Sequence, residues 1–333
     1  MKTVSGSNKM PGASNASIII PTYNRPGDLE TTVASILRQT VPPREIIVVD
    51  DGDLGEPPLR SHALRQGIHY LYIQKPRGMR GLTRSRNLGV EKASGDIIFF
   101  FDDDVELFDD FLENALAVYE KFPRVSGIGG GEVFNQPDTI SARLWFIYDV
   151  LFCMSGFKKG FFLPSCFSTN MGTPVLKTRF SRVEFLGGAS FSFRRDVFDK
   201  YRFSEEFDGY GLGEDKEFSY RVSRDHILMS TPRARLYHYE SPVMRYQKFQ
   251  KARAKIISKY VFLTRCNVKG RFKGFWFCYA MAGYLLKRTI IMFLSFDRGE
   301  VDRVRGILSG FREILTIHRK RPWSKRGQNV VKT

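Results

Sequence analysis

Residues 17–121 alternate short β-rich runs with segments of helical pattern, and this alternation constrains the fold more than any other feature of the chain. The expected strands cover residues 17–20, 45–49, 69–73 and 96–101. The expected helices cover residues 28–39, 82–93 and 109–121. Strands that alternate with helices in this way are typical of βαβ units and of a parallel sheet. We therefore expect an α/β fold in which helices flank a mostly parallel, twisted sheet.

Clusters of polar residues follow three of the four expected strands. They are Pro21-Thr22-Tyr23-Asn24-Arg25 after the first strand, Asp50-Asp51 after the second and Asp102-Asp103-Asp104 after the fourth. In open α/β sheets, ligands bind outside the carboxyl ends of the strands. The sequence therefore predicts a ligand site at this edge of the sheet.

The three consecutive aspartates at 102–104 would repel one another unless a positive charge neutralises them. A hard divalent cation, bound through one or two carboxylates and completed by substrate phosphates, would supply that charge. The alternative is a solvated loop or a helix start, because Asp109 and Asp110 follow and acids favour the first turn of a helix.

Three further sites allow two interpretations each. An acid in Asp50-Asp51-Gly52 could accept hydrogen bonds from a ribose or a base, although Asp-Gly is also a common turn. Asp215 follows a Gly-rich loop and could act as a general base or simply cap the next helix. His238 is one of five histidines, and its role as a ligand depends on a metal nearby.

The second half of the chain has weaker patterns. Residues 140–182 are rich in Phe, Gly and Ser without clear periodicity, and we interpret them as a long connection or lid over the site. We expect strand character over residues 183–194, a helix over 213–224, a short strand over 227–230, helices from 241 onward and a loose tail over 324–333.

The positive charge of the chain is concentrated near its C-terminus. The whole sequence has a formal net charge of +17, whereas residues 245–333 contain 22 Lys or Arg against 4 Asp or Glu. The basic excess therefore says little about the ligand of the main domain. The cysteines show no metal-type spacing, and residues 1–15 lack the apolar core of a signal peptide. We expect a cytoplasmic protein with a flexible N-terminus over residues 1–15.

Residues 275–296 are apolar enough to raise the question of a membrane. A spanning helix needs about 20 apolar residues, and a central cation costs about 2.5–3.5 kcal/mol on insertion scales. Lys287 and Arg288 lie near the middle of the segment, which disfavours a span. A helix lying in the interface, with its cations reaching anionic headgroups, explains the segment better. The alternative is a helix packed on the main domain. We expect residues 241–333 to form a basic helical extension on the inner face of the membrane, and no nucleic-acid partner.

Six short motifs, in their order along the chain, resemble those of family 2 glycosyltransferases. They are Pro21-Thr22-Tyr23-Asn24-Arg25-Pro26, Val48-Val49-Asp50-Asp51-Gly52, Ser85-Arg86-Asn87-Leu88-Gly89, Asp102-Asp103-Asp104, Gly187-Gly188-Ala189 and Gly213-Glu214-Asp215. The resemblance covers residues 16–240. It implies a GT-A fold, with a nucleotide-binding half over about residues 16–135 and an acceptor-binding half over about residues 136–240.

The resemblance also implies roles for the matching residues. Those expected to contact the donor nucleotide are Pro21, Thr22, Tyr23, Asn24, Arg25, Asp50, Asp51, Arg86, Asn87, Asp102, Asp103 and Gly188. Asp102 and Asp104 match the D-x-D pair that holds ribose and Mn²⁺ or Mg²⁺, with His238 as a further metal ligand. Asp215, with Glu214 beside it, matches the acid proposed as catalytic base.

These roles fit the chemistry of glycosyl transfer. Displacement of a nucleoside diphosphate from an anomeric carbon requires neutralisation of the leaving diphosphate, which a metal ion provides. The attacking hydroxyl must lose a proton, which a carboxylate can accept. A single displacement inverts the anomeric centre. The chain has no Q-x-x-R-W motif after Asp215, so we expect transfer of one sugar rather than chain extension.

The sequence thus predicts a metal-dependent, inverting glycosyltransferase of the hexosyltransferase type. Its donor would be a UDP- or GDP-linked sugar, and its acceptor a hydroxyl of a glycan or of a lipid-linked precursor in polysaccharide or glycoconjugate biosynthesis. The alternatives are a non-catalytic nucleotide-sugar-binding or scaffold protein at the membrane and a sugar nucleotidyltransferase. The latter would require a Gly-rich basic loop after the first strand, where this chain has Pro-Thr-Tyr-Asn-Arg-Pro.

Overall fold

The fold is known from a computed structural model, which describes residues 14–133, 139–169, 180–205, 212–241, 247–266, 268 and 272–320. The expected loose tail, almost all of the expected flexible N-terminus and the glycines at 209 and 211 lie outside these residues.

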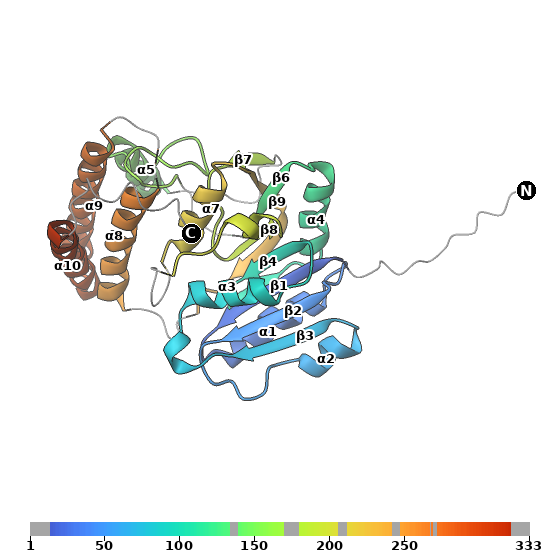
Figure 1. Cartoon of the computed structure of the whole chain (residues 1–333). Helices are drawn as coiled ribbons and strands as arrows, with labels where there is room; N and C mark the ends of the chain where they lie inside the picture. The colour runs from blue at the N-terminus through green and yellow to red at the C-terminus, as the bar shows by residue number, and fades with distance from the viewer. Residues whose placement is uncertain are drawn as a thin grey trace, which may run out of the picture.

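In the part of the chain that the structure describes, nine strands form a single sheet, and helices lie on both sides of it (Figure 1). The strands are β1 (Ala16–Thr22), β2 (Glu45–Asp50), β3 (His69–Gln74), β4 (Ile97–Phe101), β5 (Val105–Leu107), β6 (Val125–Glu132), β7 (Ser181–Val183), β8 (Ser190–Arg194) and β9 (Ile227–His238). The helices are α1 (Pro26–Leu37), α2 (Arg60–Arg65), α3 (Leu82–Lys92), α4 (Phe111–Lys121), α5 (Ile140–Leu151), α6 (Val197–Lys200), α7 (Glu214–Val222), α8 (Lys248–Arg265), α9 (Lys273–Ser295) and α10 (Arg298–Lys320), with a 3₁₀ turn at Arg77–Met79.

The sheet has the strand order β3-β2-β1-β4-β8-β6-β9-β5, and β7 pairs with β9 beside this path. The first four strands are parallel to one another, as their sequence predicts. All residues of β1, β2 and β4 are buried, which explains why these strands are continuous apolar runs rather than alternating patterns.

The other half of the sheet is mixed, so the prediction of a mostly parallel sheet holds for the first half only. Strand β8 runs antiparallel to both β4 and β6, and β9 runs antiparallel to β5 and β7 but parallel to β6. In this half the chain no longer places a long helix between every pair of strands, and antiparallel neighbours do not need one.

Two strands of the mixed half differ from expectation for identifiable reasons. Strand β6 was not predicted, because its sequence is rich in glycine, which disfavours strands in general. Here the glycine is required, since a Cβ on Gly127 would lie 2.6 Å from the ring of Phe193. Strand β9 continues to His238 rather than ending at residue 230, and the register of its pairing with β6 shifts near Pro232. That proline made the strand look finished in the sequence.

The interpretation of residues 140–182 as an unpatterned lid is wrong for its first part, which forms helix α5. This helix shows no amphipathic period because apolar residues occur on all its faces, and none of its residues is buried. It is attached to α9: the Tyr148 hydroxyl donates to the Gly283 carbonyl at 2.9 Å, and Lys287 pairs with Asp149 at 2.7 Å. The 170–179 part of the expected lid lies outside the described residues.

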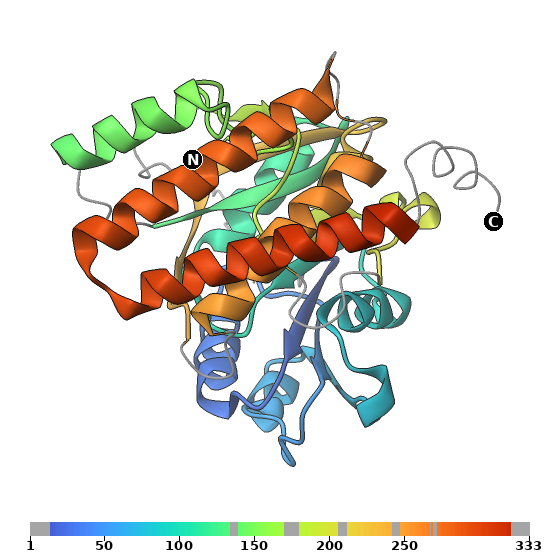
Figure 2. The same ribbon diagram turned by 90° about the vertical axis from the view of Figure 1, so that its left-hand side faces the viewer.

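The C-terminal region is helical, as expected. Helices α8, α9 and α10 share a core with residues of the 152–167 segment, and Figure 2 shows α9 and α10 crossing the same face of the molecule, with α5 beside α9. Within the described residues, α9 is one helix whose length and apolar composition would allow it to cross a membrane. About a quarter of that stretch is buried against the protein (28%), which leaves much of the helix exposed.

Candidate active site

The candidate active site lies where β1 and β4 end. Strand β2 pairs on one side of β1 and β4 on the other, and such a reversal of strand order opens a crevice at the carboxyl ends of the strands. Thr22 closes β1, and Asp102 directly follows β4. Strand β8 runs back beside β4, so that the Asp102 amide donates to the Ala189 carbonyl at 3.3 Å.

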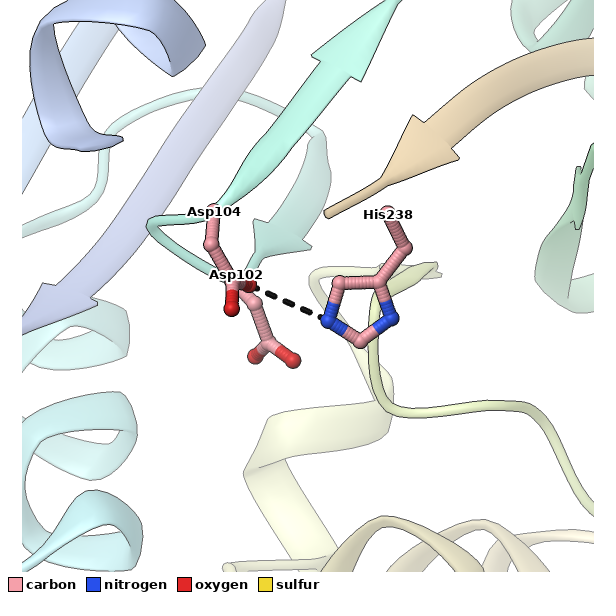
Figure 3. Close-up of side chains that lie close together, drawn as sticks. All are labelled: Asp102, Asp104 and His238. Carbon is pink, nitrogen blue, oxygen red and sulfur yellow. Dashed lines mark ion pairs between the residues drawn. The ribbon is translucent and has the colours of Figure 1, made fainter. Parts of the chain in front are cut away.

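Asp102, Asp104 and His238 converge at this point (Figure 3). Each offers one ligand atom, and these atoms lie within 4.8 Å of one another. The short strand β5 explains why, because it pairs Val105 with His238 and so brings the end of β9 beside Asp104. The structure thus brings together the three residues that the sequence predicts as metal ligands, although His238 lies more than 130 positions from the two aspartates in the chain.

The charges of Asp104 and His238 stabilise each other. His238 Nε2 lies 3.1 Å from Asp104 Oδ1, and the Ser241 amide donates to Asp104 Oδ2 at 2.9 Å. Burial alone would favour the neutral acid, but the hydrogen bond and charge of His238 hold the pKa of Asp104 at about 2. Burial likewise opposes the charge of His238, but the hydrogen bonds to Asp104 and Glu132 raise the pKa of the imidazole to about 10.

Arg86 connects the acids that follow β4 with those that begin α7. Its guanidinium is buried and donates to Glu214 Oε1 at 2.6 Å and to Asp102 Oδ1 at 3.2 Å. It also packs on the rings of Phe191 and Phe203. Burial, and then the charge of Asp215, raise the pKa of Glu214, while Arg86 opposes that rise. The sequence predicts that Arg86 contacts the donor nucleotide. These contacts instead favour a role in positioning the acids.

Asp215 lies in the first turn of α7, half-buried and facing the loop before β8. A Cβ on Gly188 would lie 3.1 Å from Asp215 Oδ2, so glycine at this position gives the carboxylate its room. Burial raises the pKa of Asp102, the charges of Arg86 and His238 oppose that rise, and the charges of Asp104 and then Asp215 add to it. The predicted base thus shares one site with the predicted metal ligands.

Asp103 is not part of this cluster. The Thr22 hydroxyl donates to Asp103 Oδ2 at 2.7 Å, and Arg25 Nη1 lies 3.0 Å from Asp103 Oδ1. Burial raises the pKa of Asp103 to about 6 despite Arg25 and Thr22. The middle residue of the D-x-D motif, with Thr22 and Arg25, therefore connects β1 to β4, and this arrangement favours a structural role over the predicted nucleotide contacts.

The two acids after β2 differ in role. Asp50 is fully buried, and its carboxylate accepts hydrogen bonds from the Gly52 and Leu54 amides and the Tyr72 hydroxyl. This pattern is that of a turn, the alternative interpretation of Asp-Gly. Asp51 is more exposed and pairs with Lys75 at 2.7 Å. Asp51 therefore remains the better candidate for a nucleotide contact.

An open cavity of about 500 Å³ adjoins these residues. It is lined by Asn24, Gly52, Asp53, Gln74, Lys75, Pro76, Arg77 and Arg80. Tyr23 lies next to it, with the Arg80 guanidinium 5.2 Å from the centre of its ring. Pro21, by contrast, is buried in β1, and Asn87 binds the backbone of Phe203 through both its amide atoms at 3.0 Å. Neither of these two reaches the cavity through a described contact.

The basic side of this cavity, made by Lys75, Arg77 and Arg80, was not expected from the sequence. A signal was present, because these residues directly follow the strand expected at 69–73 and so belong to the same sheet edge. Glu132, whose carboxylate lies 3.8 Å from His238 Nδ1, was not expected either. That contact had no signal, since it depends on the unpredicted strand β6.

The donor set at Asp102, Asp104 and His238 suits a divalent cation. Two carboxylates and one imidazole offer oxygen and nitrogen ligands of the kind that bind divalent first-row metals, and carboxylates suit Mg²⁺ and Mn²⁺ in particular. The imidazole must be neutral to coordinate, so metal binding at this site would release a proton. The chemistry of the site therefore fits a metal, and the ion itself is not identified.

Known proteins resemble this chain in sequence. The sequence pattern of Glycosyl transferase family 2 matches residues 17–202. A glucosyl-dolichyl phosphate glucuronosyltransferase of Haloferax volcanii is 28% identical over 184 residues, covering 55% of this chain and 53% of that protein. A GalNAc(5)-diNAcBac-PP-undecaprenol beta-1,3-glucosyltransferase of Campylobacter jejuni is 25% identical over 194 residues, covering 58% of this chain and 56% of that protein. The chain thus spans about half the length of these relatives.

Solved structures share the fold at low sequence identity. The mannosyltransferase PcManGT of Pyrobaculum calidifontis, in complex with GDP-Man and Mn²⁺, covers 91% of this chain and 87% of its own, with a TM-score of 0.54 and 14% identity. Residues 1–349 of S. aureus TarS cover 91% and 82%, with a TM-score of 0.52 and 15% identity. With the family pattern spanning more than half of its residues, the chain belongs to glycosyltransferase family 2 and has the GT-A fold.

Proposed function

We propose that this protein is a metal-dependent, inverting glycosyltransferase that moves one sugar from a UDP- or GDP-linked donor to an acceptor hydroxyl. The observation that carries the proposal is the convergence of Asp102, Asp104 and His238 beside Asp215 at the ends of β1 and β4. A metal ion held by the first three residues would neutralise the leaving diphosphate when it is bound.

The chain's own residues would then do the rest. Asp215 would accept the proton of the attacking hydroxyl, because it lies half-buried at the rim of the same site. Arg86 would fix the separation of the two acidic motifs through its hydrogen bonds to Glu214 and Asp102. Asn24, Asp51 and the basic residues of the neighbouring cavity would hold the nucleotide.

The acceptor we propose is lipid-linked and reached at the inner face of the membrane. The names of the two relatives specify a dolichyl phosphate and a PP-undecaprenol acceptor. In this chain, Ile140, Leu144, Ile147 and Leu151 form one exposed apolar stripe on α5. Phe275, Leu286 and Phe293 form another on the adjacent α9. We call these two stripes the apolar face; with the basic C-terminal region, they suit an anionic bilayer surface.

The donor site can be tested through the melting temperature of the full chain. We expect one of UDP, GDP, dTDP and CMP to raise the midpoint only when Mn²⁺ or Mg²⁺ is present. A ligand at 100 times its Kd adds about 2.7 kcal/mol, or a few degrees for a chain of this size. Asp104→Ala should abolish the shift, whereas Asp109→Ala, which removes an exposed acid just beyond β5, should keep it. A folded protein that no nucleotide stabilises would overturn the proposal.

The membrane surface can be tested by flotation with phosphatidylglycerol vesicles. The double substitution Ile147→Ser and Leu286→Ser should weaken binding, because each removes an exposed side chain of the apolar face. Leu64→Ser, which removes an exposed leucine of α2, serves as the control. Equal binding of all three proteins would argue for a site that is reached from solution.

A further inference from the structure

Three lysines gather next to the catalytic base on the acceptor side of the site. Lys216 directly follows Asp215 on α7, and Lys255 and Lys259 lie four residues apart on one face of α8. The two helices are in close contact, since a Cβ on Gly213 would lie 2.7 Å from Ser258 Oγ. We call Lys216, Lys255 and Lys259 the lysine cluster.

The three ammonium groups surround one small patch. Lys216 Nζ donates to the Ser168 hydroxyl at 3.0 Å, and Lys259 Nζ lies 3.6 Å from the centre of the Phe167 ring. Lys255 Nζ lies 5.2 Å from the centre of the Tyr284 ring on α9. The Phe167 and Tyr284 rings are themselves in contact, with centroids 6.3 Å apart. The cluster is therefore a single feature built from four segments of the chain.

In the part of the chain that the structure describes, no carboxylate forms an ion pair with any member of the lysine cluster. Asp215, Glu214 and Glu132 act on Lys216 only at longer range. Burial, and then the charges of Lys255 and Lys216, lower the pKa of Lys259, which only the Cys166 thiol opposes. Uncompensated positive charge in a half-buried place is costly, and an anionic ligand would offset that cost.

The position of the cluster indicates which anion this would be. It lies beside Asp215, where the acceptor hydroxyl must come, and Tyr284 belongs to the helix whose outer side carries the apolar face. Three ammonium groups match the two negative charges of a bridging diphosphate better than the single charge of a carboxylate or of a bridging phosphate. We infer that the lysine cluster binds the diphosphate that joins the acceptor's sugar to its lipid, an inference that rests on the function proposed above.

The test uses farnesyl phosphate as a short probe, with farnesol as its uncharged counterpart. Binding to the full chain is measured by titration calorimetry in EDTA, so that no divalent metal contributes. The double variant Lys255→Gln, Lys259→Gln should bind farnesyl phosphate at least about tenfold more weakly than the wild type, since a hydrogen bond to a charged group is lost at each site. Lys92→Gln, an exposed lysine of α3, should bind it like the wild type. Farnesol should bind weakly and equally to all three proteins.

Two further binding measurements on the same variants show which kind of molecule carries the anion. Binding to phosphatidylglycerol vesicles should be unchanged in the double variant, and a loss as large as that for farnesyl phosphate would make the cluster a headgroup site and overturn the assignment. A selective loss of UDP-glucuronic acid over UDP-glucose, each with Mn²⁺, would assign the cluster to the donor sugar and overturn it as well. Equal binding of farnesyl phosphate by the variant and the wild type would also overturn it. The metal-dependent melting shift with nucleotides is measured on the same samples, so that a failed donor site is recognised separately.

Discussion

Within the described residues, charged side chains form ion pairs at the strand ends, whereas those of the lysine cluster between α7 and α8 do not. At the strand ends, buried charges are paired: Arg86 with Glu214 and Asp102, Arg25 with Asp103, Lys75 with Asp51 and His238 with Asp104. The lysine cluster has no such partner among the described residues. A paired network fixes its geometry before a ligand arrives, whereas an unpaired cluster keeps its electrostatic cost until a ligand removes it.

The largest effect should come from Asp215, which lies between the two regions. Asp215→Asn removes the proton acceptor but keeps the shape of the side chain, so turnover should fall by about 10²–10⁴-fold. The readout is release of nucleoside diphosphate from the sugar nucleotide whose nucleotide stabilises the protein, in the presence of membrane lipid extract. The midpoint shift with nucleotide and metal should remain.

Asp225→Asn is the matched control, because Asp225 is an exposed acid just beyond α7 that pairs with Lys200. Turnover of Asp215→Asn within tenfold of this control would mean that another group accepts the proton.

The next effect breaks the paired network. Arg86→Met leaves Glu214 and Asp102 buried without their shared cation, which should lower the free energy of unfolding by about 3–5 kcal/mol. Arg84→Met, on the same helix, removes an exposed pair with Glu205 and should cost less than about 1 kcal/mol. Denaturant unfolding measures both. Similar losses for the two variants would show that the Arg86 network does not hold the site together.

This contrast also explains what the sequence could predict. Asp51 and Asp102 follow strands of the expected parallel half, so their place at one edge follows from the rule that parallel strands end there. Asp215 begins a helix of the mixed half, and only the family resemblance predicted that it belongs to the same site. The turn role of Asp50 was one of the two interpretations of Asp-Gly, but the roles of Asp103 and Arg86 could not be predicted in this way. They depend on partners from other segments of the chain, and only the folded structure shows which side chains those are.

The helical side was less predictable for a different reason. Helix α5 has no polar face to give a period, because its apolar residues point both toward α9 and outward. The lysine cluster joins α7, α8 and residues 167–168, which are up to about 90 positions apart and share no motif. What distinguishes the cluster is that no described carboxylate pairs with it, and this can be recognised only once the neighbouring residues in the fold are known.

The unpaired region should respond to mutation with the opposite sign. Lys259→Met replaces a half-buried, unpaired ammonium with an apolar side chain of similar length, so the free energy of unfolding should rise by about 1–3 kcal/mol. Lys251→Met is the control, because Lys251 is an exposed lysine of the same helix outside the lysine cluster, and its replacement should change stability by less than about 0.5 kcal/mol. Both are measured by denaturant unfolding at pH 7. Destabilisation by Lys259→Met would mean that the ammonium is already compensated within the protein.

The smallest effect is the pH dependence of that gain. Burial first, and then the charges of Lys255 on α8 and Lys216 on α7, lower the pKa of Lys259 below its ordinary value of 10.5, while the nearby Cys166 thiol opposes this. Between the lowered pKa and 10.5, the unfolded chain binds the proton and the folded protein does not, so wild-type stability rises with pH in that window. Lys259→Met lacks this contribution. The stability difference between variant and wild type should therefore be greatest near neutral pH and shrink as the pH approaches 10.5, by at most about 1.4 kcal/mol per pH unit.

Unfolding curves collected from pH 7 to 10 measure this difference, and the contributions of the other titrating groups cancel because both proteins contain them. A difference that stays constant over this range would mean that Lys259 keeps its proton throughout, as it would if a carboxylate already compensated it, and the lysine cluster would then belong with the paired charges of the strand ends.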